Sequence, residues 1–179
     1  MKYMLKGVAL IILCCLFGCA SRPLAIHERP GREGLSKVID VERLRKGGNL
    51  LIVPVRGGVG VVATEELDRV TLMIVKGASE YLQQNNTPFQ ILTASNANTA
   101  DLIIKGHVTK FTKPGGFKKC VLMKQSVQLG VEGQLIDEQS DNLVLLFSRS
   151  ISSKKSHGSI DDAAYELGQW IGSFIAGHL

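Results

Sequence analysis

A continuous apolar run at residues 49–55, Asn-Leu-Leu-Ile-Val-Pro-Val, constrains the fold of this 179-residue chain more than any other feature. A strand without polar interruptions has both faces covered, as in a sheet on which helices pack. A helical pattern follows it: apolar residues recur at spacings of three and four from Leu67 to Leu82, after Thr64 as N-cap and an acidic first turn. Residues 85–88, Asn-Asn-Thr-Pro, end this pattern. The sequence therefore predicts a buried strand followed by a long amphipathic helix.

Four more strands and a second long helix are predicted downstream. The strands occupy residues 89–93, 102–111, about 121–135 and 143–151. The first of these should lie parallel to the 49–55 strand because a helix connects the two, whereas the last three should form an antiparallel meander. Ser159 with Asp162 resembles a capping box at the start of a C-terminal helix. We predict an α+β domain with a mixed sheet of about five strands, in the order β-α-β-β-β-β-α, and two main helices packed on it.

The amino-terminal residues predict a secreted, lipid-anchored protein. Two lysines precede a short apolar run that ends in Leu16-Phe17-Gly18-Cys19, a run too short to span a bilayer, which takes about 20 apolar residues. This segment resembles the signal of bacterial lipoproteins. The resemblance implies that residues 1–18 are removed and that Cys19 becomes the lipidated, palmitate-bearing N-terminus. A plain signal peptide or a membrane anchor with chance cysteines is the alternative.

The residues after the cysteine predict a location and a tether. Ala20 rather than Asp follows Cys19, which resembles an address to the periplasmic side of the outer membrane. Prolines and glycines among charges at residues 22–34 predict a tether, followed by a short helix with Ser36 as its cap. Between Arg22 and Lys46 the chain has seven basic and four acidic residues, which could help to hold the tether against anionic headgroups.

The domain organisation follows from these segments. We predict a lipoprotein signal peptide at 1–18, a lipidated N-terminus with a basic tether at 19–46, and a single α+β periplasmic domain at 47–179. Cys120 would then be the one free cysteine of the mature chain. It is either a small buried hydrophobe or a thiol that forms an intermolecular disulfide or reacts.

No catalytic motif stands out. The glycines of Gly58-x-Gly60-x-x-Ala63 lie between a strand and a helix, but the helix cap comes only at Thr64 and no acidic residue ends the second strand, so the pattern does not fit a dinucleotide site. The four histidines have no metal-ligand spacing. We therefore expect no enzyme, no cofactor and no metal, and the neutral domain does not fit nucleic-acid binding.

The meander would gather lysines at one rim of the sheet, which we call the lysine rim. The end of the third strand, the start of the fourth and the end of the fifth meet there. Its candidate partner or membrane contacts are Lys110, Lys113, Phe117, Lys118, Lys119, Lys124, Lys154 and Lys155. The rim is either a docking surface for anionic headgroups, glycan or an acidic partner, or a solvated edge that discourages aggregation. The glycine loop with Gly57, Gly58 and Gly60 is a further candidate contact.

Three segments resemble a known group of envelope lipoproteins. The strand ending in Ile52-Val53-Pro54-Val55, the amphipathic helix after it, and residues 100–108, Ala-Asp-Leu-Ile-Ile-Lys-Gly-His-Val, are similar to lipoproteins with a TolB amino-terminal-like fold. That group includes the curli secretion channel lipoprotein, the lipoprotein activators of penicillin-binding proteins and the Pel exopolysaccharide lipoprotein. The resemblance covers most of residues 49–178 and carries over no functional residues.

The resemblance implies a non-catalytic domain that forms rings or docks on a larger machine. We expect a lipid-anchored accessory or scaffold protein of an outer-membrane assembly, secretion or polysaccharide-export machine. It should form a homo-oligomer and bind other envelope proteins. One alternative is an activator of a cell-wall synthase. Another is a periplasmic carrier of lipid or a small molecule, with its pocket between helix and sheet.

Overall fold

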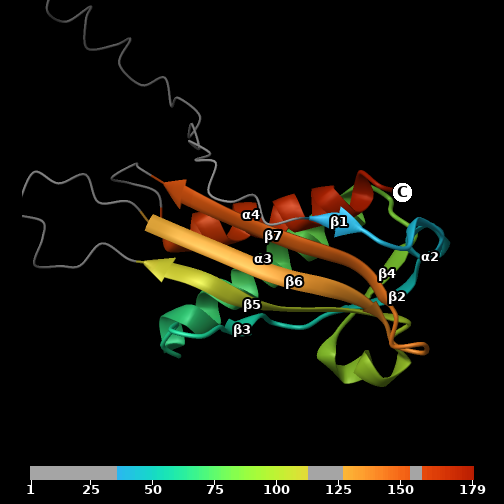
Figure 1. Ribbon diagram of the computed structural model, residues 1–179, viewed down its shortest axis with the longest axis horizontal. Helices are drawn as coiled ribbons and strands as arrows, with labels where there is room; N and C mark the ends of the chain where they lie inside the picture. The colour runs from blue at the N-terminus through green and yellow to red at the C-terminus, as the bar shows by residue number, and fades with distance from the viewer. Residues whose placement is uncertain (1–35, 113–126, 154–158) are drawn as a thin grey trace, which may run out of the picture.

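The protein is a mixed β-sheet with two long helices packed on one face, as Figure 1 shows. The computed structural model describes residues 36–112, 127–153 and 159–179. The strands are β1 (Lys37–Val38), β2 (Gly48–Ile52), β3 (Arg56–Gly57), β4 (Phe89–Leu92), β5 (Leu102–Thr112), β6 (Val127–Asp137) and β7 (Leu143–Ser153). The helices are α2 (Val41–Lys46), α3 (Glu65–Gln84) and α4 (Ile160–Ala176), with a 3-10 turn, η1 (Ala94–Thr99).

The strand order across the sheet is β1-β7-β6-β5-β2-β4, and β3 also pairs with β5. β2 lies parallel to both β4 and β5, while β5, β6 and β7 are antiparallel neighbours. These directions confirm the predicted parallel crossover and the predicted meander. The α+β class with two main helices is also confirmed. The sheet has seven strands rather than about five, because two-residue strands add at β1 and β3.

Helix caps form where the sequence places cap residues. The Thr64 hydroxyl accepts the Leu67 N–H at the start of α3. At the start of α4, Ser159 and Asp162 each accept the backbone N–H of the other, at 3.1 Å in both cases, which completes the predicted capping box. Local side-chain bonds of this kind depend on a few neighbouring residues, so the sequence predicts them well.

The segment before β2 differs from the expected tether helix. Ser36 does not cap a helix: its hydroxyl accepts the Ser148 N–H at 3.1 Å and donates to the Ser148 carbonyl at 3.3 Å, which fixes β1 against β7. The short helix α2 begins later, with Asp40 as its cap. Leu44 of α2 is fully buried in the core, so the fold extends to residues before Gly47.

The two long helices touch through glycines. A Cβ atom at Gly77 of α3 would lie 2.2 Å from the Tyr165 carbonyl oxygen, and one at Gly168 of α4 would lie 2.1 Å from the Ile74 carbonyl oxygen. The backbones of α3 and α4 therefore approach too closely for any larger residue at these two positions. Both helices bury their apolar faces against one side of the sheet, the helix face.

Candidate binding groove on the outer face of the sheet

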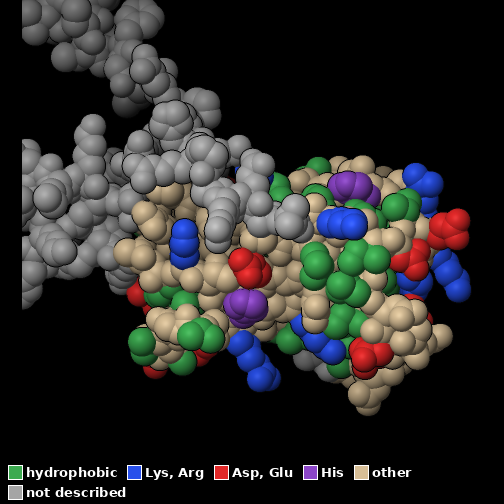
Figure 2. Space-filling view, in the orientation of Figure 1, with side chains coloured by type: hydrophobic (Ala, Val, Ile, Leu, Met, Phe, Trp, Pro, Cys, Tyr) green, Lys and Arg blue, Asp and Glu red, His purple; other side chains and the backbone are tan. Residues whose placement is uncertain are grey.

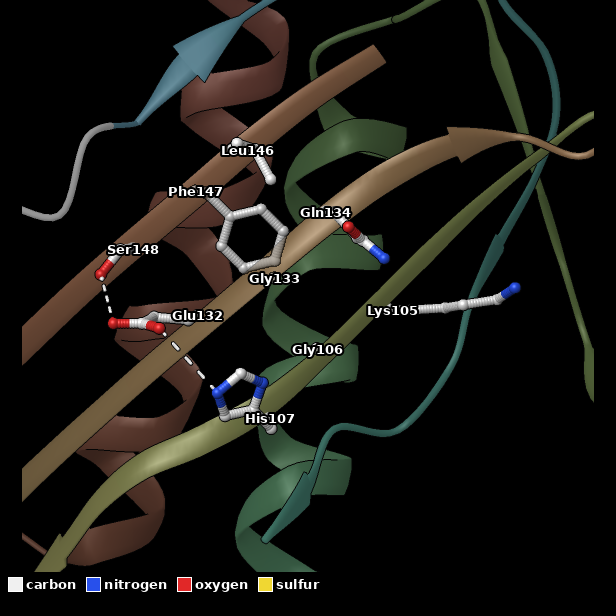
Figure 3. Close-up of a pocket in the computed structure, with 9 residues that line it drawn as sticks. All are labelled: Lys105, Gly106, His107, Glu132, Gly133, Gln134, Leu146, Phe147 and Ser148. Atoms are coloured by element: carbon white, nitrogen blue, oxygen red, sulfur yellow. Dashed lines mark hydrogen bonds and ion pairs between the residues drawn. The ribbon is translucent and has the colours of Figure 1, made fainter. Parts of the chain in front are cut away.

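The face of the sheet opposite the helices, the outer face, is open and partly polar. The antiparallel register places Lys105, Gln134 and Leu146 in one row across β5, β6 and β7, and His107, Glu132 and Ser148 in the next row. Directly opposed residues in an antiparallel sheet point to the same side. Figure 3 shows these side chains in front of the strands, with α3 and α4 behind.

These two rows line an open groove with a volume of about 560 Å³. Its floor is the backbone of Gly106 and Gly133 together with Phe147. A Cβ atom at Gly133 would lie 2.3 Å from Cζ of Phe147, so the glycine allows the aromatic ring to pack across β6 into the core. The absence of a side chain at this position therefore shapes the floor of the groove.

The polar residues of the groove are joined into a chain. The Ser148 hydroxyl donates to Glu132 Oε1 at 3.3 Å, and Glu132 Oε2 lies 3.9 Å from His107 Nε2 (Figure 3). The side chains of His107 and Glu132 are 51% and 52% exposed, so water screens this pair and its net attraction is small. Because the carboxylate lies between the hydroxyl and the imidazole, the histidine cannot activate the serine as in a catalytic triad.

What the groove offers chemically is a set of hydrogen-bonding groups beside one apolar side chain. The ammonium of Lys105, the amide of Gln134 and the carboxylate of Glu132 can all bond to a polar ligand, while Leu146, 37% exposed, offers apolar contact. The arrangement suits non-covalent binding. Within the described residues, the space between helices and sheet, where the carrier alternative would place its pocket, is lined by the buried apolar core.

The structure describes only some of the residues that the sequence nominated. Lys110 is exposed on β5 and pairs with Gly130, beside the His107 row. Cys19, Cys120 and most of the lysine rim lie outside the described residues. The rim residues outside are Lys113, Phe117, Lys118, Lys119, Lys124, Lys154 and Lys155.

Two of the three glycines in the glycine loop lie close against β5. Gly57 pairs with Val108 in the β3–β5 ladder, and the Gly58 N–H donates to the Val108 carbonyl at 2.9 Å. A Cβ atom at Gly58 would lie 2.8 Å from both this carbonyl oxygen and the His107 ring. Gly60, with φ of +83°, has nothing within 4 Å of a Cβ position, so the tip of the loop stands clear of the domain.

Sequence reasoning missed a polar cluster at the far end of the sheet, which we call the Arg43 clamp. The Arg43 guanidinium bonds to the Asp137 carboxylate and also donates to the Gly47 and Asp101 carbonyls, at 2.8 and 3.3 Å. Asp137 further accepts the N–H and hydroxyl of Ser140, both at 2.9 Å. These bonds, above all the one from Arg43, lower the pKa of Asp137 from 3.8 to about 2.

The described residues contain no cluster of three or more His, Cys, Asp or Glu side chains that could hold a metal ion. None of the helices in this part of the chain is long and apolar enough to cross a membrane.

No protein-family model matches the sequence, and no curated protein matches it either. Among solved structures, the fold is similar to the PelC dodecamer from Paraburkholderia phytofirmans, with a TM-score of 0.55 and 14% identity over 78% of this chain and 95% of that one. A point variant of the same dodecamer gives a TM-score of 0.54, at 14% identity over 78% and 94% of the two chains. At this identity the likeness shows the fold alone, and it bears out the expected Pel-like fold.

Lipoprotein GNA1162 from Neisseria meningitidis is also similar, with a TM-score of 0.45 and 15% identity over 73% of this chain and 99% of that one. A likeness with this lower score supports no argument about function.

Proposed function

We propose that this chain is a lipid-anchored, non-enzymatic accessory or scaffold protein of an outer-membrane assembly, secretion or polysaccharide-export machine, and that it acts as a homo-oligomer. The observation that carries the proposal is the fold shared with the PelC dodecamer, which is an assembly of many copies. The Leu16-Phe17-Gly18-Cys19 motif supports the lipid anchor, and Ala20 after it supports a location on the periplasmic side of the outer membrane.

The function would be positional. Lipid on Cys19 would hold the domain at a membrane surface, because several acyl chains together give stable attachment where one does not. The 16 residues between Cys19 and Ser36, treated as coil, would reach roughly 20 to 25 Å. This short reach favours work close to the anchoring membrane over activation of a synthase across the periplasm. The polar side chains of the groove, Lys105, Glu132 and Gln134, would be available to contact a polar partner.

The proposal is tested by crosslinking the full-length tagged protein in cells, beside a Cys19→Ala variant expressed at the same level. We expect fatty-acid labelling that depends on Cys19 and a ladder of multiples of the protomer that weakens without the lipid. Gel sizing and mass spectrometry identify the bands. A single band that contains a cell-wall synthase would instead make this chain an activator, and absence of labelling would remove the lipid anchor.

A further inference from the structure

Of the large apolar side chains exposed on the described residues, all but Leu72 of α3 belong to two parts of the surface, which we call patches. The first, the α3 patch, comprises Val59 and Val62 in the loop that leads into α3, with exposures of 106% and 76%. The second, the β1 patch, comprises Ile39, Val41 and Leu146, with exposures of 49%, 37% and 37%. Scattered exposed apolar residues need no explanation, but grouping of this kind marks interaction sites. In Figure 2, hydrophobic side chains are visible at the end of the molecule where β3 lies and again on the side where β1 lies.

The two patches belong to opposite edges of the sheet. β1 is the edge strand beside β7, whereas β3 pairs with β5 on the side away from β6. β7, β6 and β5 lie between them, so four strand spacings separate β1 from β3, or about 19 Å at 4.8 Å per spacing. One neighbour docked on β1 therefore leaves the α3 patch free for another.

The charges around the patches have opposite signs. Near the β1 patch lie Lys37, which is opposite Leu146 in the ladder, and Arg45 and Lys46 in the last turn of α2, against the two acids Asp40 and Glu42. The first turn of α3, next to Val62, instead carries the acids Glu65, Glu66 and Asp68. The nearby Arg69 is paired with Asp161 at 3.0 Å and lies 3.9 Å from Glu66, and Arg56 of β3 adds one exposed positive charge, so acids still outnumber bases on this side. Such complementarity sets the register and choice of partner more than the affinity.

We infer that the α3 patch of one copy docks on the β1 patch of the next, so that copies join head to tail. A contact between two different surfaces of the same chain is heterologous, and its repetition gives a closed ring when the rotation between copies closes. A second copy fits better than an anionic lipid surface, because the acidic first turn of α3 would be repelled by such a surface. The inference rests on the proposed function only for the premise of a homo-oligomer, and it names the two surfaces that build it.

The test uses two full-length variants, each with one patch disabled, purified in mild detergent and sized by native mass spectrometry. Val59→Lys with Val62→Lys places positive charge opposite the basic β1 side, and Ile39→Glu with Leu146→Glu places negative charge opposite the acidic turn. For each variant alone, we expect the oligomeric fraction to fall at least tenfold relative to the wild type. An equimolar mixture should recover a 1:1 complex, because each variant keeps the surface that the other lacks.

Gln83→Lys with Gln84→Lys, in the exposed last turn of α3, is the control for added charge and should leave the oligomer intact. Should a charged variant fail to fold by circular dichroism, Val59→Ser with Val62→Ser and Ile39→Ser with Leu146→Ser replace it. Self-association of either patch variant alone, or a mixture without a complex, would overturn the head-to-tail contact and leave the proposed function standing. A wild-type protein that stays monomeric would overturn both this contact and the oligomeric part of that function, while Cys19-dependent labelling still reports on the anchor.

Discussion

The two ends of the sheet differ in what their side chains do. At the end where α2 packs beside the β6–β7 turn, polar groups form hydrogen bonds with one another. At the other end, beside β3, apolar side chains are exposed to solvent. In the Arg43 clamp, one guanidinium reaches a carboxylate and two backbone carbonyls from different elements. At the loop end, Val59 and Val62 are the most exposed of the large apolar side chains described. The difference teaches that the clamp end holds the fold together, whereas the loop end contributes little to stability and is free to serve as a contact surface.

The largest effect should come from removing the clamp cation. Arg43→Ala leaves the Asp137 carboxylate, only 11% exposed, without its cationic partner, and we expect a loss of about 4 kcal/mol in the free energy of unfolding. Arg45→Ala is the matched control, because its guanidinium is exposed and, within the described part of the chain, donates only to the Leu179 carbonyl. Urea denaturation of both variants measures the difference. Equal losses would mean that the Arg43 clamp contributes no more to stability than an exposed side-chain contact.

Two glycines with positive φ sharpen the comparison, one at each end. A Cβ atom at Gly47, φ +68°, would lie 2.3 Å from the Pro88 carbonyl oxygen, whereas one at Gly60, φ +83°, would meet open space. Gly47→Ala combines backbone strain with a clash and should cost about 3 kcal/mol, and Gly60→Ala, with strain alone, about 1 kcal/mol. Thermal denaturation monitored by circular dichroism gives both values. A larger loss at Gly60 than at Gly47 would reverse our view of the two ends.

Acid should weaken the clamp end selectively. The pKa of Asp137 falls from 3.8 to about 2 on folding, so its contribution to stability is fully present above pH 4 and is lost as the pH falls toward 2. The shift corresponds to about 2 kcal/mol, at 1.36 kcal/mol per pKa unit. Urea midpoints from pH 6 to pH 2.5 should fall more steeply for the wild type than for Asp137→Asn. Parallel curves for the two proteins would contradict the assigned pKa.

The smallest effect on stability is expected at the loop end. Val59→Ser with Val62→Ser changes only exposed side chains and should alter the free energy of unfolding by less than about 0.5 kcal/mol. The same variant should reduce the oligomer seen by native mass spectrometry. A stability loss comparable with that of Arg43→Ala would show that these valines belong to the core and not to a contact surface.

Patterns along the chain predicted the elements better than the partners between elements. The 3.6-residue period and the Thr64 and Ser159 caps located both long helices, and alternation located the strands of the meander. The exact register was beyond such patterns, because alternation alone is satisfied by any shift of two residues. The groove depends on that register, since only the observed pairing puts His107, Glu132 and Ser148 in one row.

By itself, the sequence determined the α+β class, the parallel crossover and the meander, because these follow from local apolar periods and from the length of the connections. Only the tertiary structure decided that Ser36 pairs with Ser148 and that Arg43 reaches Asp137. It also decided that most of the exposed large apolar residues lie in two patches. The physical reason is that such contacts join residues far apart in the chain, and their partners are fixed by how the layers pack and not by the residues beside them.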